Sequence, residues 1–286
     1  MGCVEFTPGA GIHRNGEHRQ NAFIRRIERL SQPKQQRWNL GLFVTLNLVG
    51  LGLFLSWSIQ GLPTRSIWDS LDEKFFAYTN GLLDSDSPYR LAVAIMSSRV
   101  FQYGADIIVF GAIGFHVLKK ISFRPLPLVG EASIAAILWA ALLIASKSFS
   151  TSLGRPGPTR FYDNAVELSN VYAWELKDAA HSSFPASQAS IDLLALVVGL
   201  YFLRRVNVGV SVALLAVVLC CTLTIPRLLS GAHWLSDVTA GSAALALIFA
   251  GWVLGSPLIK ACVPIAIRAF QLLKKRYANP QDEENL

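Results

Sequence analysis

The sequence predicts an all-α membrane protein, a polytopic bundle of six transmembrane spans with both termini in the cytoplasm. Composition supports this prediction first: 52% of the 286 residues are hydrophobic and only 16% are charged, whereas soluble domains usually carry about 25% charged residues. Charge is also nearly absent from several long runs of the chain. Such runs suit hydrocarbon surroundings as helices, because a helix satisfies its backbone hydrogen bonds internally. Lysine and arginine gather at the ends of these runs, as is typical of membrane helices.

Six apolar runs are candidates for the spans, since a helix rises about 1.5 Å per residue and the hydrocarbon core is about 30 Å thick. The first run, 40–59, contains no charged residue and follows a polar, basic start. We therefore expect it to act as an uncleaved signal anchor. Two later runs contain one aspartate each, Asp106 and Asp192. The later runs are 101–118, 132–149, 189–203, 206–225 and 238–258.

Lysine and arginine also predict the orientation of the bundle. Seventeen of the 26 basic residues fall in the N-terminal tail, in the turns after the second and fourth spans, and in the C-terminal tail. Six spans place these four segments on one side, which the positive-inside rule identifies as cytoplasmic. The chain then divides into a basic cytoplasmic tail (1–39), the six-span unit (40–258) and a basic, amphipathic cytoplasmic tail (259–286). The outward-facing segments are 60–100, 150–188 and 226–237.

The distribution of charge and of cysteine excludes several classes of function. The net charge of +7 lies mainly beside the apolar runs, so we expect no nucleic-acid partner. The four cysteines lack metal-ligand spacing and indicate neither a disulfide framework nor a zinc site. The outward-facing segments contain no carboxylate cluster of the kind that binds magnesium. We therefore expect no metal and no cofactor, and the sequence indicates no required protein partner.

The outward-facing segment PRLLSGAHWLSD contains a histidine, an aspartate and an arginine. His233 and Asp237 are four residues apart, so on a helix they would share a face. The carboxylate could then fix the imidazole tautomer and stabilise its cation, which leaves the other ring nitrogen free to attack or to take a proton. Arg227 precedes the pair, and a guanidinium can bind phosphate through two hydrogen bonds. The structural alternative is a pair that only caps a helix, but titratable groups at a membrane boundary favour a functional role.

Two other outward-facing clusters carry polar residues. The segment KSFSTSLGRPGP places Lys147 and Arg155 at the end of the third span, with Arg155 in a turn that prolines stiffen. A lysine at a span end can alternatively be a snorkelling anchor. The segment KDAAHSSFPASQAS, before the fourth span, holds His181, Ser187 and Gln188. A helix that begins there would offer free backbone amides to an oxyanion.

Together the three clusters resemble the type 2 phosphatidic acid phosphatase (PAP2) superfamily. Arg227, His233 and Asp237 match its third motif in identity and spacing, and the upstream Arg-Pro and Ser-Phe-Pro motifs occur in the same order. The similarity runs roughly over 40–258. Within the superfamily, the chain looks most like the lipid A phosphotransferases of Gram-negative inner membranes. This likeness lies in LVGLGLFLSW, RPGPTRF, KDAAHSSFPASQ and PRLLSGAHWLSD.

The resemblance implies an enzyme that moves a phosphoryl group from undecaprenyl diphosphate to a lipid A phosphate at the periplasmic face of the inner membrane. By position, His233 would be the nucleophile that becomes a phosphohistidine, and Asp237 would orient it. Arg155 and Arg227, with Lys147, would bind phosphate. The partners would then be two membrane lipids, undecaprenyl diphosphate as the donor and lipid A as the acceptor.

Two positions depart from the family pattern. Seven residues separate Lys147 from Arg155 instead of six, and Gln188 stands where the second motif ends in histidine. That histidine is the acid that protonates the leaving group, and glutamine has no titrating proton. Removing an acid costs an ordinary monoester phosphatase about 10²–10⁴-fold in rate. A diphosphate instead releases a phosphate whose second pKa is about 6, so it can leave with little protonation. Alternatively, His181 supplies the proton.

Three other functions compete with the transferase. A hydrolase of the same superfamily, such as an undecaprenyl diphosphate phosphatase, would use the same donor chemistry with water as the acceptor. A catalytically inactive binding or scaffold protein would explain Gln188, although the retained Arg227, His233 and Asp237 argue against it. A channel or transporter would explain Asp106 and Asp192, but such carboxylates also pair with polar neighbours inside a bundle.

Overall fold

The computed structural model describes residues 38–122 and 126–278, and within these ranges the chain is almost entirely helical, with no β-strand. Nearly all of the predicted N-terminal tail lies outside the described residues, as do residues 279–286. In the described part, six helices are long and apolar enough to cross a membrane, which confirms the predicted all-α bundle of six spans. These spans are Leu40–Ser58, Arg99–Lys120, Leu128–Phe161, Ser187–Arg205, Val210–Leu229 and Asp237–Gly255.

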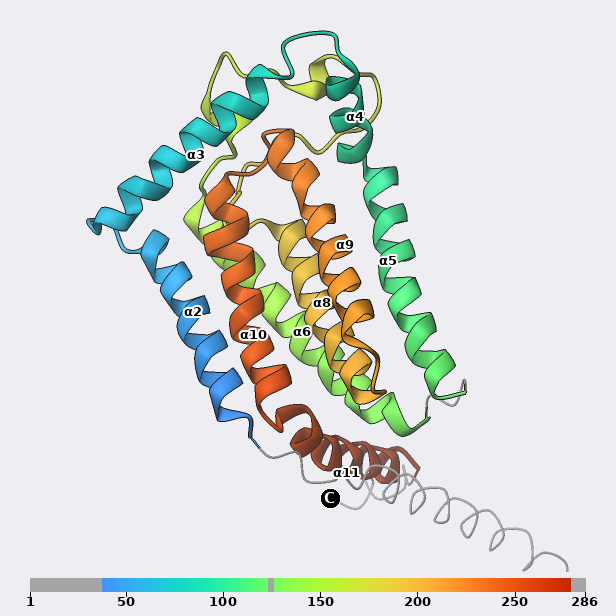
Figure 1. The fold of residues 1–286 in the computed structure, drawn as a ribbon. Helices are drawn as coiled ribbons and strands as arrows, with labels where there is room; N and C mark the ends of the chain where they lie inside the picture. The colour runs from blue at the N-terminus through green and yellow to red at the C-terminus, as the bar shows by residue number, and fades with distance from the viewer. Residues whose placement is uncertain (1–37, 123–125, 279–286) are drawn as a thin grey trace, which may run out of the picture.

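Helix α8 (Ser187–Arg205) lies at the centre of the bundle (Figure 1). In the most apolar stretch of α8, 50% of the residues are buried inside the protein. The corresponding share is 11% in α2 (Leu40–Ser58), which lies on the outside of the bundle. The helices that contact α8 are α5 (Arg99–Lys120), α6 (Leu126–Leu153), α9 (Val210–Leu229) and α10 (Ala244–Gly255), together with the helical segment Asp237–Ala243 that leads into α10. Because α8 touches all of these, the position of its first turn is tied to most of the bundle.

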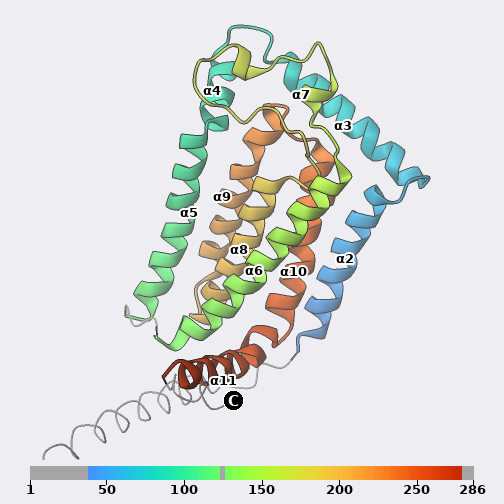
Figure 2. The ribbon, with the colours of Figure 1, turned by 180° about the vertical axis from the view of Figure 1, so that it is seen from behind.

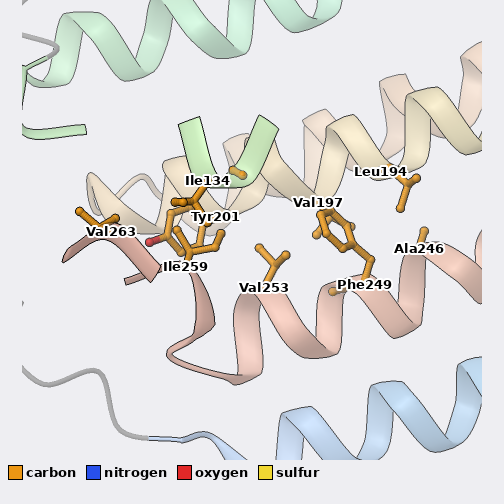
Figure 3. Packing of buried hydrophobic residues seen from close by; sticks show 11 residues of the cluster. Ile134, Leu194, Val197, Tyr201, Ala246, Phe249, Val253, Ile259 and Val263 are labelled. Carbon is orange, nitrogen blue, oxygen red and sulfur yellow. The ribbon is translucent and has the colours of Figure 1, made fainter. Parts of the chain in front are cut away.

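An apolar cluster joins α8 to α10 (Figure 3). Leu194, Val197 and Tyr201 of α8 pack with Phe249 and Val253 of α10. The spacing of the α8 residues, three and four apart, places them on one face of the helix. This contact between α8 and α10 fixes the start of α8 relative to the segment that precedes α10.

Helix α11 (Leu258–Ala278) lies across the end of the bundle that is opposite α3 and α4 (Figures 1 and 2). Its buried residues Ile259 and Val263 pack in the same cluster as Ile134 of α6. The amphipathic character expected of the C-terminal tail at the membrane surface stays a prediction. Its assignment to the cytoplasm rests on the basic residues and stays a prediction.

Helix α2 approaches α10 closely because glycines remove side chains from the contact. A Cβ atom on Gly50 of α2 would lie 2.8 Å from the Ala244 carbonyl oxygen, and one on Gly255 would lie 2.9 Å from the Phe43 Cα. Neither distance is open to a real side chain without movement of the backbone. The two helices therefore form a tight pair. The chain continues from α2, after a short turn, into the next helix, which covers one end of the bundle.

Two helices that the sequence did not predict cover this end, in the segment 60–100. Helix α3 (Pro63–Gly81) begins with proline at its first position, and α4 (Pro88–Ser97) begins after Ser87, whose hydroxyl accepts a hydrogen bond from the Arg90 N–H. Proline at the first turn and serine at the N-cap are common helix-start residues. Figures 1 and 2 show both helices above the ends of the spans. They therefore lie beside the polar clusters.

Candidate active site

The three polar clusters meet at the end of the bundle that α3 and α4 cover, away from α11 (Figure 2). They lie on the connection between α9 and α10, on the start of α8, and on the connection between α6 and α7 (Pro158–Phe161). Main-chain hydrogen bonds tie these segments together: the Gly157 N–H donates to the Ala180 carbonyl at 2.8 Å, and the Ser183 N–H donates to the Arg155 carbonyl at 2.7 Å. The site is thus built from segments that are distant in sequence.

A tight turn positions His233. Helix α9 ends at Leu229, and Gly231 adopts a φ of +77°, a conformation that favours glycine. A Cβ there would lie 2.7 Å from the Thr159 Cγ2 and 2.9 Å from the Phe76 Cε2. The Thr159 N–H also donates to the Gly231 carbonyl at 3.2 Å. The turn is therefore held both by its own conformation and by its neighbours.

The His233 ring has a defined tautomer. Its side chain is buried, and Nδ1 lies 3.0 Å from the Ser183 carbonyl oxygen. A carbonyl only accepts, so Nδ1 carries the hydrogen and the neutral ring keeps the lone pair on Nε2. Asp237 Oδ2 lies farther away, 3.6 Å from Nδ1. The tautomer is therefore set by a main-chain carbonyl, whereas the sequence predicted that Asp237 would set it.

Asp237 stands in the first turn of the helix that follows His233. His233 itself precedes this helix, so the pair does not share a helical face as the spacing suggested. The Trp234 N–H donates to Asp237 Oδ2 at 2.7 Å, as in one half of a capping box. The other oxygen, Oδ1, accepts from Arg155 Nη1 at 2.8 Å. The fully buried carboxylate thus has a partner on each oxygen.

Arg155 is held between two carboxylates and two indole rings. Its Nη1 donates to Asp237 and to the Ser236 hydroxyl, the latter at 2.9 Å, and its Nη2 donates to Asp72 at 2.8 Å. The guanidinium carbon lies 4.9 Å from the ring centroid of Trp57 and 5.0 Å from that of Trp234. Cations over indole faces gain electrostatic stabilisation. The structure thus joins Arg155 to His233 through Asp237.

Asp72 of α3 is a site residue that sequence reasoning missed. Its carboxylate is 1% exposed, and it accepts hydrogen bonds from Arg155 and from the Ser236 N–H and hydroxyl, at 2.8 and 2.6 Å. Burial raises the pKa of Asp72, and the hydrogen bonds from Ser236 and Arg155 oppose this rise. The only signal in the sequence is spacing: Asp72, Phe76, Thr79 and Asn80 form the buried face of the helix.

Arg227 is buried beside the site but turns its guanidinium elsewhere. Its carbonyl accepts from the His233 N–H at 3.2 Å. Its Nη1 donates to the Lys177 carbonyl at 2.7 Å, its Nη2 donates to Gln102 of α5, and its Nε lacks a partner among the described residues. The structure therefore places Arg227 next to His233 along the main chain, with its charged end directed at α5 and the segment before α8.

Gln188 turns into the bundle. Its amide nitrogen Nε2 donates to Asp106 Oδ2 and to Asp192 Oδ1, both at 3.0 Å. Both hydrogens of the amide are thereby used, and the second oxygen of Asp192 has no partner among the described residues. The two aspartates that suggested a channel or transporter are thus bridged by one glutamine, as expected for carboxylates that find polar neighbours inside a bundle.

The remaining predicted site residues are exposed. Lys147 lies on the last turns of α6, and its ammonium has no hydrogen-bond or ion-pair partner among the described residues. His181 is exposed in the segment before α8, and Ser187 is exposed at the first position of α8. Across the described ranges, no group of three or more histidine, cysteine, aspartate or glutamate side chains could hold a metal ion.

This arrangement suits nucleophilic or general-base chemistry at His233 Nε2. The carbonyl of Ser183 holds the hydrogen on Nδ1, and the carboxylate of Asp237 stabilises a positive charge on the ring once Nε2 forms a bond. The guanidinium of Arg155 is the cation bound to that carboxylate, and the site is largely shielded from water.

Comparisons with known proteins agree with this chemistry. The model of the PAP2 superfamily matches residues 100–258, which include Arg155, Gln188, Arg227, His233 and Asp237. The chain is also 26% identical over 244 residues, 84% of its own length and 98% of the relative's, to the lipid A 1-diphosphate synthase of Escherichia coli (strain K12). No solved structure shows significant similarity to the chain.

Proposed function

Since the chain belongs to the PAP2 superfamily, we propose that it is a phosphotransferase that moves a phosphoryl group from undecaprenyl diphosphate to a phosphate of lipid A. Membership and the distant E. coli relative support a membrane enzyme of the lipid phosphatase or phosphotransferase type. The acceptor and the donor are our proposal, and so is the location of the site at the periplasmic face of an inner membrane.

The observation that carries the proposal is the hydrogen bond between His233 Nδ1 and the Ser183 carbonyl oxygen, at 3.0 Å. It keeps the lone pair on Nε2, which is the nitrogen that attacks phosphorus. In the first step, a bond forms between Nε2 and the terminal phosphorus, and the bond from that phosphorus to the bridging oxygen breaks. Undecaprenyl phosphate leaves with the electron pair. In the second step, an oxygen of the acceptor phosphate attacks the phosphohistidine, and the N–P bond breaks.

The surroundings of Gln188 support a diphosphate donor. Its amide is committed to Asp106 and Asp192, so it does not replace the acid of the second motif. An enzyme that expels an alkoxide needs such an acid, whereas a phosphate leaving group with a second pKa of about 6 leaves without one. His181, the alternative proton source, is exposed and has no polar partner among the described residues.

Positive charge for the transferred group comes from Arg155 and Arg227, with Lys147 as an exposed cation on the last turns of α6. Both guanidinium groups already donate to oxygens of the protein. Phosphate binding by either arginine therefore requires an exchange of partners, except at Arg227 Nε, which lacks one. This exchange costs part of the stabilisation that a cation already aimed at the transferred group would give in a shielded site.

The test uses purified protein, undecaprenyl diphosphate labelled in its terminal phosphate, and lipid A. We expect labelled lipid A as the product and, without lipid A, an acid-labile label on the protein. His233→Asn should lower transfer by at least about 10³-fold and abolish the protein label, whereas His116→Ala, on α5, should keep both. Free phosphate as the sole product would instead identify a hydrolase. A protein label that persists in His233→Asn would contradict the proposed nucleophile.

A further inference from the structure

We propose that Asp72 is a positioning residue for the reaction at His233, acting through Arg155 and Ser236. This inference rests on the proposed role of His233 as the nucleophile. It assigns a part in the chemistry to α3 (Pro63–Gly81), which lies outside the residues that the family model matches, 100–258.

The contacts of Asp72 account for both of its oxygens. Oδ1 accepts from the Ser236 N–H at 2.8 Å, and Oδ2 accepts from the Ser236 hydroxyl at 2.6 Å and from Arg155 Nη2 at 2.8 Å. A carboxylate buried to this extent is tolerated only with such partners. Three donors on a single buried carboxylate leave little freedom for either partner to move.

These partners lead directly to the reacting side chain. Ser236 is the residue before Asp237, and Arg155 binds Asp237 Oδ1 with its other terminal nitrogen at 2.8 Å. Asp237 Oδ2 in turn lies 3.6 Å from His233 Nδ1. Asp72 therefore fixes the residue before Asp237 and also the cation bound to Asp237. The carboxylate that faces the imidazole is held from both directions.

The charges of Asp72, Arg155 and Asp237 also support a role for Asp72 in the reactivity of His233. Two carboxylates, Asp72 and Asp237, share one guanidinium, that of Arg155. With Asp72 ionised, the three groups carry an excess of one negative charge next to the His233 ring. Without Asp72, Arg155 neutralises Asp237 alone, so Asp237 stabilises the positive ring less. Arg155 Nη2 and the Ser236 N–H would also lose their acceptor, which favours a shift of both groups.

The alternative is that Asp72 only anchors α3 over the bundle. An anchoring residue would alter the stability of the protein, whereas a positioning residue alters the reactivity of His233. The two roles are distinguished by Asp72→Asn, which keeps the shape of the side chain, compared with Glu73→Gln. Glu73 is the next residue of α3 and is exposed, so its replacement removes the same charge without touching the cluster.

Two measurements read out the reactivity of His233. The first is the rate at which labelled undecaprenyl diphosphate is consumed, from which kcat and KM are obtained. This rate is measured regardless of which acceptor takes the phosphate. The second is the rate at which phosphoramidate, a small phosphoryl donor, phosphorylates His233. For Asp72→Asn we expect kcat and the phosphoramidate rate to fall about 10–10²-fold, since a small misplacement of a reacting group costs this much. We expect KM to change less than about 3-fold, and Glu73→Gln to match the unaltered protein.

A double variant links the effect to Arg155. Because Asp72 acts partly through Arg155, the losses in Asp72→Asn and Arg155→Gln should combine to clearly less than their product in the double variant, since residues that act as a unit are not additive. A lower thermal midpoint with unchanged kcat and unchanged phosphoramidate rate in Asp72→Asn would overturn the proposal, and so would multiplied effects in the double variant. If the unaltered protein does not consume the diphosphate, the proposed function fails, and the phosphoramidate rates still decide the role of Asp72.

Discussion

At the scale of single residues, the site depends on a main-chain atom as much as on side chains. The Ser183 carbonyl sets the tautomer of His233, and Asp237 faces the same ring nitrogen from 3.6 Å. In catalytic triads where only an aspartate holds the histidine, replacement by asparagine costs about 10⁴-fold, because it favours the wrong tautomer. Here the tautomer does not depend on the aspartate, so Asp237 contributes mainly its charge.

This division of roles predicts a moderate effect of Asp237→Asn. We expect kcat for consumption of the diphosphate to fall about 10–10²-fold, which is well short of the loss of at least about 10³-fold expected for His233→Asn. Asp163→Asn, at an exposed position, serves as the control and should leave kcat unchanged. A loss in Asp237→Asn equal to that in His233→Asn, in a variant of normal thermal stability, would mean that the carboxylate sets the tautomer after all.

At the scale of secondary-structure elements, the pairing of α2 with α10 determines where α3 lies. The two helices approach each other at Gly50, and α2 continues after a short turn into α3, which carries Asp72. Trp57, near the end of α2, also lies against Arg155. A change in the distance between α2 and α10 should therefore move two neighbours of Arg155 together.

We predict that Gly50→Leu disturbs the site from a distance. The added side chain meets the Ala244 carbonyl and Ile248 at 2.8 Å, and overpacking of this kind typically lowers the free energy of unfolding by about 1–3 kcal/mol. Thermal midpoints in detergent and the rate of diphosphate consumption should both fall. Gly52→Leu is the matched control on the same helix, because no atom lies within 4 Å of a Cβ at that position. Equal effects of the two variants would argue against the tight contact.

At the scale of the whole molecule, the sequence predicted all six spans, because long runs without charge are the strongest signal a membrane protein offers. Five agree with the structure to within four residues at each end, whereas the third, predicted as 132–149, extends over Leu128–Phe161. It did not predict α3 and α4, whose buried faces mix polar and apolar residues. Of the residues that the sequence singled out, the structure brings Arg155, His233 and Asp237 together and directs the guanidinium of Arg227 elsewhere. It could not predict that Arg155 also pairs with Asp72, 83 residues away, or that Ser183 binds through its carbonyl, since main-chain acceptors leave no trace in residue type.

The predicted orientation has a direct test in a variant without native cysteines. A single cysteine is placed either in the exposed α7–α8 connection, as Asn164→Cys, or on the exposed part of α11, as Ala269→Cys. A maleimide that cannot cross membranes should label Asn164→Cys in intact spheroplasts and Ala269→Cys only after permeabilisation, because the basic segments are retained inside. Labelling in the reverse order would place the site in the cytoplasm and remove lipid A of the outer leaflet as the acceptor.

The segment before α8 serves the site chiefly through its backbone. Its carbonyls at Lys177 and Ser183 accept from Arg227 and His233, and its carbonyl at Ala180 accepts from the Gly157 N–H. Backbone oxygens are the same in every residue type, so these three contacts survive most substitutions in the segment. An insertion or a deletion between Lys177 and Ser183 would instead move at least one of these carbonyls away from its donor. Relatives that share this chemistry should therefore keep the length of the segment more strictly than the residue types at 177, 180 and 183.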